Sequence, residues 1–270
     1  MEGLMSILRS LLFVLVLMLG VCGPSLAEGD LRYAGATTLQ RFFMPEAARV
    51  FADQTDLLFS IEGGNTAPGL ASLLKGEIDV AGAGRRLTQQ EKSAGLVEHF
   101  LGWDMLTIVV NQANPVESLT LEQLQAIFSG EIDHWKDVGG PDLPIIVVTS
   151  PRGSGMRSSV QNLILGESAY LKREVVAGIV AEADKQVTLF QSAITALSRS
   201  MVNEQGVKII KVDEVEATAE NLAGGRYPLA KPLTLVTRGV PQGGLARFIE
   251  LATGPRGQEI LARHFVPKIQ

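Results

Sequence analysis

The stretch that decides the fold is Ser150-Pro151-Arg152-Gly153-Ser154-Gly155-Met156-Arg157. It follows an apolar run, residues 144–149, that predicts a buried strand, and it precedes residues 158–165, which predict a helix. A strand that breaks into a glycine-rich turn before a helix points several backbone N–H groups outward at the helix start. The arginines of the turn, Arg152 and Arg157, add positive charge, and its serines add hydroxyl donors. We interpret the turn as a candidate cradle for an oxyanion, with an ordinary strand-to-helix loop as the alternative.

The same order of elements, a strand, a loop rich in glycine and hydroxyl residues and then a helix, occurs three times before this turn. The loops are Gly35-Ala36-Thr37-Thr38, residues 63–69 and residues 82–88. Alternating strands and helices imply an open, mainly parallel sheet, and ligands bind such sheets beyond the carboxyl ends of the strands. We therefore expect the four loops to converge at one edge. The threonine pair would also cap the helix predicted over residues 39–54, and capping is the simpler interpretation of that pair.

The first 27 residues predict a secretory signal peptide. Arg9 provides the positive start, residues 11–19 form an apolar core too short for a comfortable membrane span, and Ser25-Leu26-Ala27 is a small-x-small cleavage signal. We expect cleavage after Ala27. An uncleaved anchor is one alternative, and lipidation at Cys22 is another, although the preceding valine suits a lipidation signal poorly.

Composition excludes several classes of function. Cys22 is the single cysteine of the 270 residues, so a chain cleaved after Ala27 has no disulfide, thiol nucleophile or thiolate metal site. The formal net charge of −5 argues against a nucleic-acid partner, which would want a basic patch. The three histidines lie far apart without metal-binding spacing, so we expect no metal and no cofactor. The sequence also lacks a nucleotide-binding P-loop and a nucleophile elbow.

The middle of the chain carries signs of a crossing between two lobes. Residues 106–111 predict an apolar strand, and the polar residues that follow predict the first crossing near residue 111. Residues 167–183 predict a helix, and residues 231–237 predict a strand that returns the chain. We expect a first lobe made of residues 28–110 plus 232–270 and a second lobe made of residues 111–231.

One long run carries a specific resemblance. Residues 119–140 read Leu-Thr-Leu-Glu-Gln-Leu-Gln-Ala-Ile-Phe-Ser-Gly-Glu-Ile-Asp-His-Trp-Lys-Asp-Val-Gly-Gly and resemble, almost residue for residue, the periplasmic phosphate-binding proteins of ABC-type phosphate importers. The Gly153-Ser154-Gly155 turn follows at the family's distance, and residues 35–38, 63–69, 76–87, 221–229 and 255–258 also match. The resemblance implies an α/β fold of two lobes that close like a clamshell, each lobe a mainly parallel sheet flanked by helices.

The resemblance also implies a function and a set of binding residues. Members of the family hold dehydrated phosphate between the lobes and deliver it to the permease subunits of an ABC transporter. The family's binding loops fall on Thr37 and Thr38, on Thr66, on Arg85, and on the Gly153-Ser154-Gly155 turn beside Arg152 and Arg157. We accordingly expect a monomeric periplasmic binding protein for phosphate or a similar oxyanion, and not an enzyme.

The chain departs from the family at four places. Ser150 stands where an arginine is usual, Arg152 where an acidic residue is common, Met156 where threonine is usual, and residues 192–196 differ from the family's Gly-Ala-Ile-Gly-Tyr segment. An acidic residue accepts the proton of monohydrogen phosphate and so disfavours sulfate, which has no proton to give. We therefore expect weaker discrimination between oxyanions. One hypothesis is that Arg152 replaces the arginine missing at position 150 from a shifted position, since its fork suits phosphate and sulfate equally.

Two other functions remain open on the sequence. The altered positions are compatible with a sensory or scaffolding protein that kept the fold and lost tight binding. A phosphate-ester hydrolase would need a nucleophile or a metal site, and the sequence offers no recognisable motif for either.

Overall fold

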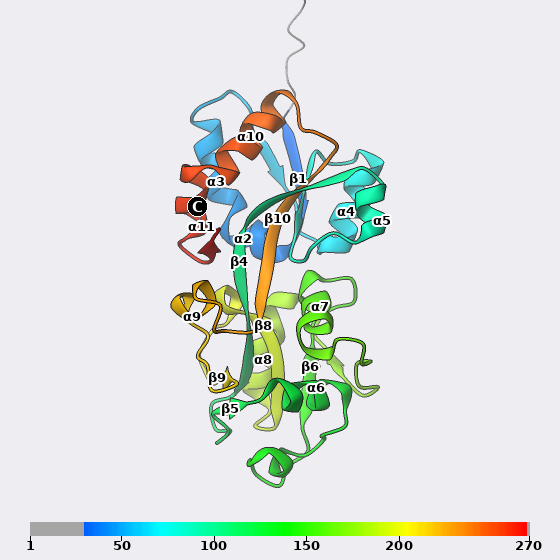
Figure 1. Cartoon of the computed structure of the whole chain (residues 1–270), viewed down its shortest axis with the longest axis vertical. Helices are drawn as coiled ribbons and strands as arrows, with labels where there is room; N and C mark the ends of the chain where they lie inside the picture. Colours follow the sequence, from blue (N-terminus) through cyan, green and yellow to red (C-terminus); the bar gives the residue numbers. More distant parts are fainter. Residues whose placement is uncertain (1–29, 269–270) are drawn as a thin grey trace, which may run out of the picture.

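The computed structural model describes residues 30–268 and has two lobes, one above the other in Figure 1. The predicted signal peptide, with Cys22, lies outside the described residues. Two long strands, β4 (Leu96–Asn111) and β10 (Ala230–Arg238), run side by side from one lobe toward the other (Figure 1). Within residues 30–268, every helix is too short or too polar to cross a bilayer.

The first lobe is built on the parallel strands β1 (Leu31–Gly35), β2 (Phe59–Ile61) and β3 (Val80–Ala83), with β1 in the middle. Strand β10 pairs antiparallel with β3 and extends this sheet. The remaining elements of this lobe are α2 (Thr37–Phe42), α3 (Met44–Ala52), α4 (Thr66–Lys75), α5 (Gln89–Ser93), α10 (Gly243–Thr253), α11 (Pro255–Leu261) and the short β11 (Val266–Pro267), which pairs with β4.

The second lobe is built on β6 (Ile146–Thr149), which lies parallel to both β7 (Val175–Val176) and β8 (Ala193–Ser198). Its other strands are β5 (Ser118–Leu119) and β9 (Val207–Val212). Its helices are α6 (Leu121–Ser129), η1 (Trp135–Val138), α7 (Gly155–Val160), the π-turn η2 (Gln161–Leu165), η3 (Val180–Glu182), α8 (Ala183–Leu189), η4 (Arg199–Met201) and α9 (Ala219–Ala223).

The chain crosses between the lobes inside β4 and not after it. Residues 96–105 of β4 pair with β10, whereas residues 106–111 pair with β8 and β9. The predicted crossing near residue 111 therefore falls at the far end of this strand. Because β4 and β10 run antiparallel to their neighbours, each lobe has a mixed sheet, with parallel pairs away from the crossing. The residue boundaries between the lobes stay a prediction.

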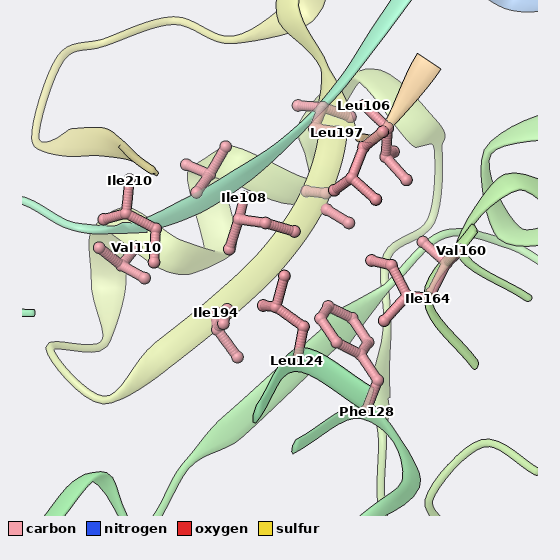
Figure 2. Packing of buried hydrophobic residues seen from close by; sticks show 14 of the residues in the cluster. Leu106, Ile108, Val110, Leu124, Phe128, Val160, Ile164, Ile194, Leu197 and Ile210 are labelled. Carbon is pink, nitrogen blue, oxygen red and sulfur yellow. The ribbon is translucent and has the colours of Figure 1, made fainter. Parts of the chain in front are cut away.

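Each lobe has its own apolar core. Figure 2 shows the core of the second lobe, where Ile108 of β4 and Ile194 of β8 pack over Leu124 and Phe128 of α6. The core of the first lobe contains a cluster of phenylalanines, in which the Phe51 and Phe248 rings meet edge to face with centroids 5.5 Å apart. Burying an apolar side chain of this size contributes about 2 kcal/mol to stability.

Two helix predictions were wrong in part or in whole. The helix predicted over residues 39–54 divides into α2 and α3 at Phe43, because Pro45 lacks an N–H and its ring would clash with the preceding turn. The helix predicted over residues 167–183 does not form, and the structure has β7 and η3 there. The β-branched pair Val175–Val176 favours a strand, and Gly178 breaks helical continuity.

Helix α6 gives a test of how the second lobe is stabilised. The Thr120 hydroxyl accepts from the Gln123 N–H at 3.1 Å, and the Gln123 amide oxygen accepts from the Thr120 N–H at 2.9 Å. We expect Thr120→Ala to lower the free energy of unfolding by about 1 kcal/mol, because it leaves helix N–H groups without a partner. Urea denaturation followed by circular dichroism measures this change.

Thr88→Ala is the matched control. It removes the same kind of cap from α5, a helix that buries none of its residues. We expect this variant to loosen α5 locally and to lower the free energy of global unfolding by less than Thr120→Ala does. An equal loss from both variants would contradict this account.

Candidate functional site

A cavity lies between the two lobes at the ends of the predicted loops. Its lining residues are Ala36, Thr37, Thr38, Asn65, Gly84, Gly155, Met156, Val180, Met201 and Lys231. All four predicted loops contribute at least one residue. The four loops do converge, but the expectation of a single sheet edge was wrong. Three loops lie in the first lobe, and the fourth follows β6 of the second lobe and meets them from the opposite side.

The first loop turns sharply after β1. The Ala36 N–H donates to the Gly82 carbonyl at 2.8 Å, so this loop and the third loop are tied together behind the cavity. The Thr37 hydroxyl donates to the Gly64 carbonyl at 3.0 Å, which ties in the second loop. Thr38 follows as the second residue of α2 and is buried at the cavity wall.

Thr66 lies where three loops meet. It begins α4 and is fully buried, although it does not itself line the cavity surface. Its hydroxyl oxygen accepts from the Gly84 N–H at 3.1 Å, and this leaves its own proton to be donated elsewhere. Thr66, which the resemblance assigned to the binding site, therefore joins the second loop to the third.

The second-lobe turn is organised by Ser154. Its hydroxyl oxygen accepts from the Arg157 N–H at 3.1 Å and caps α7, while the neighbouring Gly153 has a φ of +77° that favours glycine. Capping was instead predicted for Thr37 and Thr38, and there it was wrong, because Ala36 is the N-cap of α2 and no side chain caps that helix. Ser154 is fully buried, so its hydroxyl lies against protein and not in bulk solvent.

The two lobes touch through this turn. The Ala67 N–H donates to the Gly153 carbonyl at 3.4 Å, and the Ser159 hydroxyl lies 3.2 Å from the Gly84 carbonyl. A Cβ atom on Gly155 would lie 2.6 Å from the Thr66 hydroxyl oxygen and 3.4 Å from the Gly84 Cα. Only glycine fits at position 155 when the lobes lie this close together.

Arg85 faces away from the cavity. Its guanidinium donates to both carboxylate oxygens of Glu91 at 2.8 Å, and it also donates to the Arg86 carbonyl. The Arg85 hydrogen bond holds the pKa of the Glu91 carboxyl below its usual range. The pair keeps Glu91 in place at the start of α5.

Arg157 is also occupied by a carboxylate. Its guanidinium donates to the two Glu174 oxygens at 3.0 and 2.8 Å and lies 3.9 Å from the centre of the Tyr170 ring. Both members of the ion pair are mostly buried. Like Arg85, Arg157 does not line the cavity.

Arg152 lies on the surface of the turn. Its side chain is exposed, and within residues 30–268 it makes no hydrogen bond or ion pair. It lines no part of the cavity. The turn therefore brings its glycines and its serine to the lobe interface but leaves its first arginine in solvent.

Lys231 was not among the predicted site residues. This residue of β10 lines the cavity, is 1% exposed, and places its Nζ 2.7 Å from the Asp104 Oδ2 and 3.5 Å from the Thr38 hydroxyl oxygen. Asp104 of β4 is equally buried and also accepts from the Ser198 hydroxyl at 2.6 Å. The signal was present, because a lysine within an apolar strand needs a partner and the apolar strand β4 holds one aspartate.

The polar side chains that line the cavity are those of Thr37, Thr38, Asn65 and Lys231, and no carboxylate lines it among the described residues. No described group of three histidine, cysteine or acidic residues could hold a metal ion. Such a lining complements a small anion and offers no activated nucleophile.

Comparison with known proteins agrees with this geometry. The family model for the PBP superfamily domain matches residues 23–256. The phosphate-binding protein PstS of Bacillus subtilis is 24% identical over 234 residues, which covers 84% of this chain and 76% of the relative. The protein of the same name from Borreliella burgdorferi is 26% identical over 224 residues, covering 77% of this chain and 78% of the relative.

Solved structures show the same likeness. A Clostridium perfringens structure, described as a phosphate ABC transporter substrate-binding protein with bound phosphate, is 29% identical and superposes with a TM-score of 0.83 over 90% of this chain and 100% of its own. An ABC-type phosphate transport receptor from Vibrio cholerae, also 29% identical, has a TM-score of 0.75 over 88% of this chain and 99% of its own. With the family model matching most of its length, the chain belongs to the PBP superfamily.

Proposed function

We propose that this protein captures phosphate, or a closely related oxyanion, in the cavity between its lobes and delivers it to an ABC transporter. The observation that carries the proposal is the lining of that cavity, which combines Thr37, Thr38 and Lys231 with Gly155 of the second-lobe turn and contains no carboxylate among the described residues. Donors fixed in a space that excludes water bind an anion tightly because little reorganisation is needed.

The names of the relatives support the ligand and the transporter. The two bacterial relatives are called phosphate-binding proteins, and the Clostridium perfringens structure contains phosphate. Binding, and not hydrolysis, fits the cavity, since none of the three histidines lines it and the Ser154 hydroxyl has no general base beside it.

We also propose the cellular setting that the sequence predicts. The first 27 residues would direct export, and the mature protein would act as a monomer in the periplasm. Its partners would be the permease subunits of the transporter.

The binding residues that we propose are those that the structure brings to the lobe interface. They are the Thr37 and Thr38 hydroxyls, the Thr66 and Ser154 hydroxyls, and the backbone at Gly153 and Gly155. Arg85 and Arg157, which already pair with Glu91 and Glu174, would act by holding their loops.

Calorimetric titration of the mature protein, freed of ligand by unfolding and refolding, tests the function. We expect tight binding of inorganic phosphate. We also expect sulfate to bind within about 100-fold of phosphate, because no carboxylate lines the cavity to demand a protonated ligand.

The other outcomes are informative. Complete rejection of sulfate beside tight phosphate binding would contradict the proposed loss of discrimination. No heat with either anion, from protein shown to be folded, would instead favour a sensory or scaffolding member of the superfamily.

Gly155→Ala tests whether the observed contact between the lobes belongs to the binding state. The added Cβ would meet the Thr66 hydroxyl oxygen at 2.6 Å, and such crowding costs about 1–3 kcal/mol. We therefore expect phosphate affinity to fall about tenfold or more. Gly178→Ala is the matched control, because a Cβ there has open space and should leave the affinity unchanged.

Arg152→Ala tests the role of the exposed arginine. Because its side chain lies in solvent outside the cavity, we expect the phosphate affinity to change less than about threefold, and this small effect to vanish as salt is added. Titrations at low and high ionic strength measure both quantities. A loss of about 30-fold that persists in salt would place the guanidinium on the ligand.

A further inference from the structure

We propose that Lys231 supplies the positive charge that binds the oxyanion, and that Asp104 holds its ammonium in place. The proposal rests on the proposed function, since it assigns the charge of the same cavity. It differs from the sequence-based expectation, which gave this role to arginines of the loops.

The placement of Lys231 is the first argument. It is 1% exposed and yet lines the cavity, so its ammonium has been withdrawn from water while remaining in contact with the space between the lobes. The Nζ lies 3.4 Å from where a Cβ on Gly84 would stand, and it lies 3.5 Å from the Thr38 hydroxyl oxygen. The ammonium therefore lies among atoms from two of the converging loops.

The hydrogen-bonding capacity of the ammonium is the second argument. An ammonium has three N–H donors. One is directed to the Asp104 Oδ2 at 2.7 Å, and Thr38 is a longer partner at 3.5 Å. The ammonium thus retains donor capacity at the cavity wall, where an anionic oxygen would be a strong acceptor.

The pairing of the other cations is the third argument. Arg85 is held by Glu91 and Arg157 by Glu174, each through two hydrogen bonds, and neither lines the cavity. Arg152 is exposed. Lys231 is the one cationic residue among the described residues that line the cavity.

Asp104 has a positioning role in this account. Lys231 and Asp104 are direct partners in the antiparallel register of β10 and β4, so the carboxylate fixes the lysine side chain from the neighbouring strand. The Asp104 Oδ1 is buried without a hydrogen-bond partner, which shows that the pair is not arranged for full satisfaction of both charges.

The chemistry of an ammonium sets the class of ligand. Lysine presents a compact point charge, whereas arginine presents a planar fork that matches two oxygens at once. A site that relies on Lys231 would select for the charge of a tetrahedral oxyanion more than for its protonation or orientation. Phosphate and sulfate both meet that requirement.

A double variant separates binding from folding. Lys231→Met alone would leave a buried carboxylate unpaired, but Asp104→Leu with Lys231→Met replaces the pair by apolar groups of similar volume, which is often neutral or stabilising. The Ser198 hydroxyl keeps the Ser200 hydroxyl as a partner at 2.9 Å. We expect the double variant to unfold near the wild-type temperature and to bind inorganic phosphate roughly 30-fold or more weakly by calorimetry.

Lys208→Met is the matched control. Lys208 lies on β9, also a partner of β4, and pairs with Glu117, but it lies outside the cavity. Phosphate affinity should be unchanged in this variant. Wild-type affinity in the folded double variant would overturn the role of Lys231 and leave the proposed function standing, whereas a wild-type protein that binds no oxyanion would remove both proposals.

Asp104→Asn provides a second measurement if the double variant does not fold. This variant keeps the ammonium and removes the carboxylate charge, so a bound dianion would become the ammonium's main counter-charge. We expect a lower unfolding temperature without ligand and a larger rise on adding phosphate than in the wild type. A rise equal to or smaller than that of the wild type would contradict contact between Lys231 and the anion.

Discussion

The antiparallel pairing of β4 with β10 is the constraint on which the other features depend. Residues 96–105 of β4 pair with β10, and the same strand continues into the second lobe, where residues 106–111 pair with β8 and β9. Each lobe has its own core. The shared strands determine where the loops of one lobe meet those of the other, and they place the buried Lys231 at the wall of the cavity with its partner Asp104 behind it.

The cationic residues near this site differ in their burial and in their partners. The loop arginines are paired with carboxylates of their own lobe or exposed, so they fix loop geometry or act at long range. The polar side chains at the cavity are Thr37, Thr38, Asn65 and Lys231, and the Lys231 ammonium is paired with Asp104. Neutral donors cost less to bury than free charges, and a single paired cation is enough to attract an anion into a narrow space.

Sequence reasoning predicted the parts of the site that depend on local pattern. Glycine and hydroxyl residues after apolar strands identified three loops of the first lobe, since the carboxyl ends of parallel strands share an edge, and the Gly153-Ser154-Gly155 turn of the second lobe. The pattern did not identify Val180 and Met201, which line the cavity from short helices. It could not assign the arginines, because whether Arg157 faces a ligand or Glu174 depends on a partner that no motif brings close. Lys231 escaped notice for the same reason, since its partner Asp104 is adjacent only through the register of two distant strands.

The contact between the lobes explains why small residues lie at the contact itself, whereas the buried ion pair lies on the strands behind it. At the contact itself Gly155 lies against Thr66 and Gly84, and any larger residue would hold the lobes apart. A charged side chain placed there would both block the approach and be stripped of water without a fixed partner. The strands behind the loops are joined by their backbone hydrogen bonds, and the register of β10 on β4 places the two members of the buried ion pair opposite each other. Closure is therefore left to backbone and hydroxyl groups, and the charge that attracts the anion is built into the scaffold.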